Sequence, residues 1–190
     1  MFRAIYNRVM TWVSHPKAPW ILGGLSFAES SFFPVPPDVM LAPMALARPD
    51  RAWSFALLTT VTSVIGGLLG YFIGFFVFDS VEPLLHRLGY WDSYLLGREW
   101  FEEWGFWAVF LAGFSPIPYK VFTITAGVMS MALLPFTAAS VIGRGARFFM
   151  VAGLMRWGGE PMERKLRENV DLLGWLTVGA AAIMYFVLAH

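Results

Sequence analysis

Five charged residues stand within otherwise apolar stretches of the chain, and their chemistry points to an anion site or a proton path. They are Glu29, Asp38, Lys120, Arg144 and Arg147. A charge at the centre of a bilayer costs at least ~2.5–3.5 kcal/mol, so such residues normally face a partner or a wet cavity. The planar fork of arginine suits a phosphate group. We therefore interpret the three cations as substrate-binding residues and the two carboxylates as proton-coupling or charge-pairing residues.

The spacing of these residues supports a shared site but leaves their role open. Arg144 and Arg147 are three residues apart and therefore share one face of a helix. One alternative is that the charges only pair with one another, Asp38 with Lys120 and Glu29 with an arginine. A buried pair of this kind is weak evidence for stability. On the other reading, three cations against two carboxylates leave one positive charge that could receive a phosphate.

The composition predicts that these residues lie inside a membrane. The chain of 190 residues is 57% hydrophobic and only 14% charged, whereas soluble domains contain about 25% charged residues. A helix needs roughly 20 apolar residues to cross the hydrocarbon. Three segments meet that requirement, and we predict transmembrane helices at 52–78, 135–157 and 172–190. The net charge of +1 provides no basic surface for nucleic acid.

Two further apolar segments, 18–47 and 105–131, are interrupted by clustered prolines. Proline removes a backbone donor and clashes with the preceding turn, so these clusters cannot lie inside a continuous helix. We predict that each segment is a re-entrant hairpin that enters the membrane, turns and leaves by the same face. Such a turn is tolerated where protein or water covers its backbone. The predicted breaks are at Pro34, Pro36, Pro37, Pro116 and Pro118.

The remaining segments are polar and set the predicted orientation. Residues 1–17 form an amphipathic surface helix, 79–104 an acidic segment and 158–171 a second surface helix. Lysine and arginine favour the cytoplasmic side, which places 1–17 and 158–171 inside and the acidic segment outside. Residues 18–190 then form a single membrane domain.

The two broken segments are also similar to each other. Pro34–Asp38 is matched by Pro116–Lys120, and the Ser-Val-Ile-Gly run at Ser63 is matched by the same run at Ser140. Because one crossing separates the hairpins, the second unit enters from the opposite face, as in transporters with inverted repeats. The predicted fold is an all-α integral membrane protein with two inverted repeats. Each repeat is a re-entrant hairpin followed by a transmembrane helix, and a C-terminal transmembrane helix follows.

Other kinds of site find no support in the sequence. The serines have no accompanying His/Asp arrangement, so nucleophilic catalysis is not predicted. The three histidines are scattered and cysteine is absent, which argues against a metal site. A phosphate-cradling glycine loop is also missing. We predict no catalytic residue, no cofactor and no enzymatic activity.

Four stretches together resemble the DedA superfamily, which includes proteins with the VTT (SNARE-associated) domain, and most closely its YqaA-type branch. They are Glu29–Asp38, Gly66–Gly74, Gly113–Lys120 and Gly143–Phe149. The resemblance implies a bacterial inner-membrane protein with two opposed re-entrant hairpins that moves lipids between leaflets, notably undecaprenyl phosphate. Phospholipids are handled by other members.

The resemblance extends to the charged residues. Glu29 and Asp38 match the acidic functional positions of the family's first hairpin, and Arg144 and Arg147 match the Gly-Arg-Gly-x-Arg motif of the YqaA type. The chain departs from the family in its second hairpin. Gly113 stands where many members have an arginine, and Lys120 is displaced by one position from a second one.

The predicted function is that of a flippase or scramblase for lipids with a phosphate headgroup, either undecaprenyl phosphate or a phospholipid, with proton coupling left open. Two alternatives remain at this stage. One is a proton-coupled transporter of a small solute or cation that uses Glu29 and Asp38 as proton carriers. The other is a membrane scaffold that transports nothing, in which the charges only hold the hairpins together. The sequence leaves open whether the protein forms a homo-oligomer.

Overall fold

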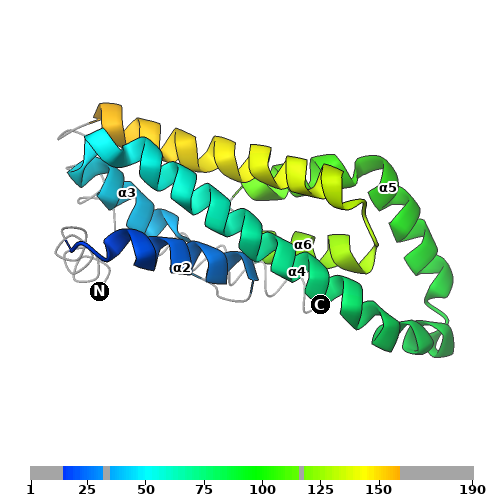
Figure 1. Ribbon diagram of the computed structural model, residues 1–190. Helices are drawn as coiled ribbons and strands as arrows, with labels where there is room; N and C mark the ends of the chain where they lie inside the picture. Colours follow the sequence, from blue (N-terminus) through cyan, green and yellow to red (C-terminus); the bar gives the residue numbers. More distant parts are fainter. Residues whose placement is uncertain (1–14, 32–34, 116–117, 159–190) are drawn as a thin grey trace, which may run out of the picture.

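The computed structural model describes residues 15–31, 35–115 and 118–158, and each regular element among them is a helix (Figure 1). This confirms the all-α class for the described part of the chain. The predicted surface helices 1–17 and 158–171 lie almost entirely outside the described residues, and the predicted transmembrane helix 172–190 lies wholly outside them. The elements are α2 (Ala18–Ser31), α3 (Asp38–Ala47), the short 3-10 helix η1 (Pro49–Arg51), α4 (Ala52–Leu88), α5 (Trp91–Phe114), α6 (Tyr119–Val128) and a last helix, Leu133–Gly158.

Two of these helices are long and apolar enough to cross a membrane. One is the continuous segment Pro49–Leu88, which contains η1 and α4, and the other is Leu133–Gly158. With 37 residues α4 is about 55 Å long, whereas the hydrocarbon core is about 30 Å thick. A large part of α4 must therefore lie outside the hydrocarbon if this helix crosses the bilayer.

The helix bounds differ from the predicted segments around the acidic stretch. Helix α4 does not end at Phe78 but continues through Asp79 to Leu88. Gly89 then ends it, with a left-handed φ of 73° that favours glycine. The acidic stretch 79–104 thus forms the end of α4 and the start of α5, and α5 begins at Trp91, well before the predicted hairpin boundary at 105. An acidic side chain alone does not stop a helix, because even aspartate costs no more than about 0.7 kcal/mol relative to alanine in a helix interior.

The clustered prolines lie where the helices are interrupted. Helix α2 ends at Ser31 and α3 begins at Asp38, while α5 ends at Phe114 and α6 begins at Tyr119. With 14, 10 and 10 residues, α2, α3 and α6 measure about 21, 15 and 15 Å, so none of the three could cross the hydrocarbon alone. The path of these segments through the bilayer stays a prediction.

Helix α4 is the axis against which both broken segments pack. A Cβ added at Gly66 would collide with the Phe27 carbonyl oxygen of α2. At Gly74 it would collide with the Ile124 carbonyl oxygen of α6, and at Gly127 with the Tyr71 carbonyl oxygen of α4. Small residues of this kind let membrane helices approach closely. The glycines of α4 therefore fix how near α2 and α6 can lie.

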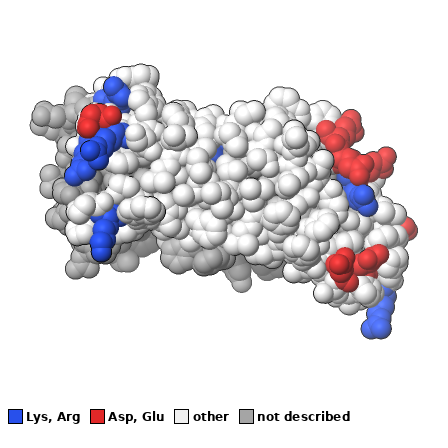
Figure 2. All heavy atoms as spheres, viewed as in Figure 1, with Lys and Arg blue, Asp and Glu red and all other residues white. Residues whose placement is uncertain are grey.

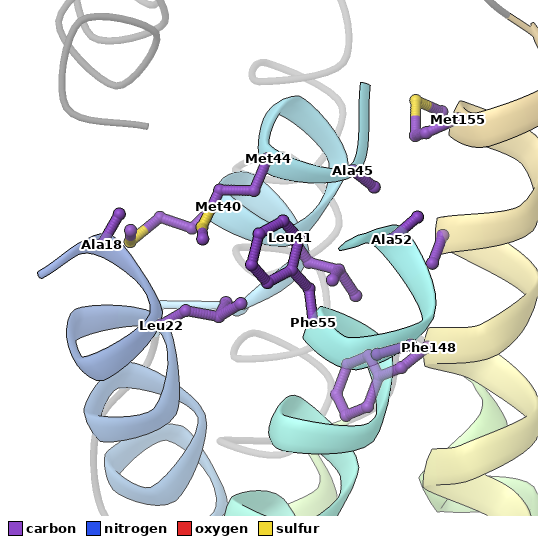
Figure 3. Packing of buried hydrophobic residues seen from close by; sticks show 12 residues of the cluster. Ala18, Leu22, Met40, Leu41, Met44, Ala45, Ala52, Phe55, Phe148 and Met155 are labelled. Atoms are coloured by element: carbon purple, nitrogen blue, oxygen red, sulfur yellow. The ribbon is translucent and has the colours of Figure 1, made fainter. Parts of the chain in front are cut away.

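Two apolar clusters fill the space between the helices. The first joins α2, α3, α4 and the last helix and is shown in Figure 3, where Leu22, Leu41, Phe55 and Phe148 point toward one another. The second joins α4, α5, α6 and the last helix around Tyr119, Phe136 and Val109. The last helix contributes to both clusters.

Charged side chains collect at the two ends of the molecule, as Figure 2 shows, and the surface between the ends is almost uncharged. One end holds Lys17, Arg48, Arg51 and Arg156, near η1 and the end of the last helix. At the opposite end, where α4 meets α5, acidic residues outnumber basic ones. They are Asp79, Glu82, Asp92, Glu99, Glu102 and Glu103. This distribution suits a chain whose basic end faces the cytoplasm.

The orientation can be tested with single cysteines, because the chain has none of its own. Asp50 and Ser93 are exposed at opposite ends of the molecule. We expect a membrane-impermeant maleimide to label the Ser93→Cys variant in intact cells and the Asp50→Cys variant only after permeabilisation. The reverse pattern would contradict the predicted orientation, and labelling of both in intact cells would contradict placement of the ends on opposite sides.

The close packing of α4 and α6 predicts a large difference between two glycine substitutions. The Gly127→Ala variant should lose about 1–3 kcal/mol of unfolding free energy, because the added methyl group meets backbone atoms that cannot move aside. The matched control is Gly24→Ala on α2, where a Cβ meets nothing within 4 Å. That change should be neutral or stabilise by about 0.5–1 kcal/mol. Denaturation in detergent monitored by circular dichroism measures both, and equal effects would contradict the packing.

Candidate functional site

Arg144 lies on the last helix, and its guanidinium group is buried between four helices. The side chain is 2% exposed. Its Nη2 donates to Glu29 Oε2 of α2 at 2.5 Å, and its Nε donates to Ser63 Oγ of α4 at 2.6 Å. A longer bond of 3.4 Å joins Nη2 to Ser30 Oγ. The arginine thus links the first broken segment, α4 and the last helix.

Aromatic rings and hydroxyl groups complete the surroundings of Arg144. The guanidinium carbon lies 4.9 Å from the centre of the Tyr119 ring on α6 and 4.6 Å from that of Phe148. Such cation–π contacts strengthen when they are desolvated. The Tyr119 hydroxyl donates to Ser140 Oγ at 2.5 Å, and the Ser30 and Ser63 hydroxyls are 2.7 Å apart. The polar groups around this charge are therefore bonded to one another.

Arg147 lies one helical turn further along the same helix and connects the two interruptions. Its Nη2 donates to Asp38 Oδ2 at 2.6 Å, and its Nη1 donates to the Ser115 carbonyl oxygen at 2.6 Å. Asp38 is in the first turn of α3, directly after the first interruption, and Ser115 caps the end of α5. The side chains of Arg147 and Asp38 are 15% and 23% exposed, so this pair is more accessible than the pair formed by Arg144.

The arrangement is suited to binding an anion. Both guanidinium groups hold a carboxylate, and carboxylates and phosphates accept the same charge-assisted hydrogen bonds from arginine. A phosphate group that displaced a carboxylate from its arginine would therefore find hydrogen-bond donors already positioned. On the face of the molecule shown in Figure 2, the surface between the two charged ends is almost uncharged.

The structure brings together four of the five charged residues selected from the sequence. Glu29 pairs with Arg144, which agrees with the alternative in which Glu29 only forms an ion pair with an arginine. Asp38 pairs with Arg147, whereas that alternative had suggested Lys120 as its partner. Lys120 is half-buried in the first turn of α6, and its carbonyl oxygen accepts a hydrogen bond from Thr123 Oγ1.

Sequence reasoning missed the uncharged groups that hold the guanidinium groups in place. These are Ser30, Ser63, Tyr119, Ser140 and the carbonyl of Ser115. One signal was present, because Ser63 and Ser140 open the two matched Ser-Val-Ile-Gly runs. A carbonyl group at a helix end carries no sequence signature at all.

The family to which the chain belongs is shown by comparison with known protein families. The family model of the VTT domain matches residues 35–157. The chain belongs to the VTT-domain family. This confirms the resemblance to the DedA superfamily, and together with the two helices able to span a bilayer it identifies a membrane protein. The matched range contains Asp38, Lys120, Arg144 and Arg147, while Glu29 precedes it.

Three relatives show how far the similarity extends. An uncharacterized protein of Haemophilus influenzae is 48% identical over the whole chain and 99% of its own length. An uncharacterized homologue in Histophilus somni is 45% identical over 99% of the chain and 98% of its own length. Undecaprenyl phosphate transporter A of Staphylococcus aureus is 32% identical over 70% of the chain and 64% of its own length. No solved structure is significantly similar to the chain.

The different burial of the two arginines in this VTT-domain protein predicts different effects on stability. Arg144→Ala should cost about 3–5 kcal/mol, because it leaves the largely buried Glu29 carboxylate, 14% exposed, without its partner. Arg147→Ala should cost less, since its pair is more exposed. The control is Arg98→Ala, which removes an exposed ion pair with Glu102 and should cost at most about 1 kcal/mol. Unfolding in detergent gives the ranking, and equal losses at Arg144 and Arg98 would contradict it.

Proposed function

We propose that this protein moves lipids with a phosphate headgroup between the leaflets of a bacterial cytoplasmic membrane without converting them chemically. Arg147 contacts the headgroup during its passage, and Arg144 holds the surrounding helices and adds positive charge one helical turn away. Lys120 is a third cation near the second interruption, and the tails remain in the bilayer. We also propose that the two broken segments are opposed re-entrant hairpins, which would bring their interruptions to the same depth.

The observation that carries the proposal is the position of Arg147 between the two interruptions. One guanidinium group contacts both the first turn of α3 and the end of α5. Charged side chains inside a membrane are costly and commonly mark functional sites, and broken helices are typical of binding sites in transporters. The relative named undecaprenyl phosphate transporter A supports a phosphate lipid as the cargo.

The scaffold alternative is favoured by one specific observation, which is that Glu29 and Asp38 each already pair with an arginine. A scaffold requires only that the ion pairs form, whereas a lipid-binding site requires the arginines at their present positions. Exchange of the charges between Asp38 and Arg147 in a double variant, Asp38→Arg with Arg147→Asp, separates the two ideas. A scaffold would keep its function after this exchange, and a headgroup site would lose it.

Leaflet exchange of labelled undecaprenyl phosphate in proteoliposomes tests the proposal directly. Wild-type protein should exchange the lipid well above protein-free vesicles. The double variant Arg144→Ala with Arg147→Ala should exchange it at least about tenfold more slowly, because loss of a desolvated charged contact costs roughly 2–5 kcal/mol. The variant Arg98→Ala is the matched control and should exchange at the wild-type rate.

Two results would contradict the lipid function. If wild-type protein moves neither labelled undecaprenyl phosphate nor a labelled phospholipid faster than empty vesicles, small-solute transport becomes the leading explanation. If the folded double-arginine variant exchanges lipid at the full rate, the arginines do not bind the headgroup. Circular dichroism and size-exclusion chromatography establish that each variant is folded before its rate is compared.

A further inference from the structure

The two ion pairs of the site differ in a way that assigns them different roles. Arg144 is 2% exposed, and its hydrogen bonds go to Glu29, Ser63 and Ser30. The rings of Tyr119 and Phe148 lie close to its guanidinium carbon. A ligand could reach this group only after several packed side chains had moved. Arg144 is therefore suited to positioning the helices rather than to exchanging partners.

The pair between Arg147 and Asp38 is more open and less completely bonded. The Asp38 side chain is 23% exposed, and it receives the Arg147 Nη2 hydrogen bond on Oδ2. The other oxygen, Oδ1, is buried and has no hydrogen-bond partner among the described residues. Glu29 Oε2 also accepts a hydrogen bond from Ser30 Oγ, whereas the second oxygen of Asp38 has no partner among the described residues and its side chain is more exposed. Asp38 is therefore the easier of the two carboxylates to displace.

The guanidinium of Arg147 has a second contact that does not depend on Asp38. Its Nη1 donates to the carbonyl oxygen of Ser115 at the end of α5. This backbone acceptor would still hold the group after the carboxylate had turned away. The donor on Nη2 would then remain in place for another oxyanion, with no need to reorganise the helix that carries it.

We propose that the Asp38 carboxylate competes with the ligand and occupies the phosphate-binding position at Arg147 when no ligand is bound. A phosphate group binds by displacing the Asp38 carboxylate from Nη2, while Arg144 keeps Glu29 and holds the surrounding helices. This inference rests on the proposed function and specifies which of the two arginines exchanges its partner.

The distinctive consequence is that loss of a negative charge from the site should improve binding. In the Asp38→Asn variant, Arg147 loses its competing carboxylate, so the affinity for a phosphate group should rise. We expect a gain of roughly tenfold, which corresponds to about 1.4 kcal/mol. Glu29→Gln makes the same chemical change at the other pair and should not tighten binding, because the Arg144 side chain is only 2% exposed. The matched control is Glu102→Gln, which removes a carboxylate from the exposed pair with Arg98 and should leave the affinity within roughly twofold of wild type.

The experiment is calorimetric titration of the full chain in detergent with three probes. Farnesyl phosphate supplies a lipid phosphate, farnesol the same tail without phosphate, and inorganic phosphate the free anion. We expect wild type to bind farnesyl phosphate more tightly than either other probe and Asp38→Asn to bind it more tightly still. Arg147→Gln should lose this preference for farnesyl phosphate over farnesol. If Asp38→Asn does not fold, Asp38→Ala removes the same charge.

Carboxylate footprinting on wild-type protein adds a test that needs no variant. Carbodiimide modification of Asp38 should increase when farnesyl phosphate is added, and that of Glu29 should stay the same. An unchanged Asp38 in the presence of bound farnesyl phosphate would overturn the competition.

The remaining outcomes separate this inference from the proposed function. If wild type binds farnesyl phosphate and Asp38→Asn binds it no more tightly, the proposal that Asp38 competes with the ligand is wrong, while the proposed lipid function stands. If Glu29→Gln gains as much as Asp38→Asn, the division of roles between the arginines is wrong. Equal binding of inorganic phosphate and farnesyl phosphate, with both tightened in Asp38→Asn, would support the exchange and contradict the lipid as ligand. If wild type and Asp38→Asn bind farnesyl phosphate no better than farnesol, both proposals fail.

Discussion

The ion pair between Arg144 and Glu29 is the interaction on which the arrangement of the helices depends. It lies where α2, α4, α6 and the last helix meet, and the Arg144 side chain is almost completely shielded from solvent. A cation placed there without a counterion would be strongly destabilising. The chain therefore has to bring Glu29 to Arg144 when it folds, even though the two residues are far apart in sequence. The serine hydroxyls and aromatic rings around the pair lower its cost further, since they replace contacts with water.

The glycines of α4 make this pairing geometrically accessible. Ser63, which accepts the Arg144 Nε hydrogen bond, is followed on α4 by Gly66, which touches the backbone of α2. Further along, Gly70 and Gly74 approach α6, which carries Tyr119. Bulkier residues would move α2 and α6 outward and lengthen the contacts to the guanidinium. The same face of α4, which carries Ser63 and the three glycines, thus determines both how closely the helices pack and where the partners of Arg144 lie.

Much of the helical framework could be predicted from the sequence, because its signals are local. Runs of apolar residues gave the two long helices, and clustered prolines indicated where Ala18–Ala47 and the stretch from α5 to α6 are interrupted. The predicted membrane span 52–78 lies within α4, and the further ten residues of the helix up to Leu88 were not predicted, since the acidic side chains that end a span do not end a helix. The types of residue in the site could be predicted, because charged side chains in apolar surroundings need partners of opposite charge. The partner of Asp38 could not be predicted, because the choice between Arg147 and Lys120 depends on how far α6 and the last helix are rotated and shifted.

A binding site for an anion within apolar surroundings faces a conflict that this structure resolves with two unequal pairs. The cations must be present before the ligand arrives, yet bare cations would be too costly to bury. An internal carboxylate at each arginine removes that cost, but it also competes with the ligand for the same donors. A tight pair at every arginine would leave nothing to bind with, and a loose pair at every arginine would leave the helices unanchored. The chain has one pair enclosed by serines and aromatic rings and another that is more exposed, with one carboxylate oxygen that has no hydrogen-bond partner among the described residues. Stability and exchange are in this way assigned to different residues of the same helix, one turn apart.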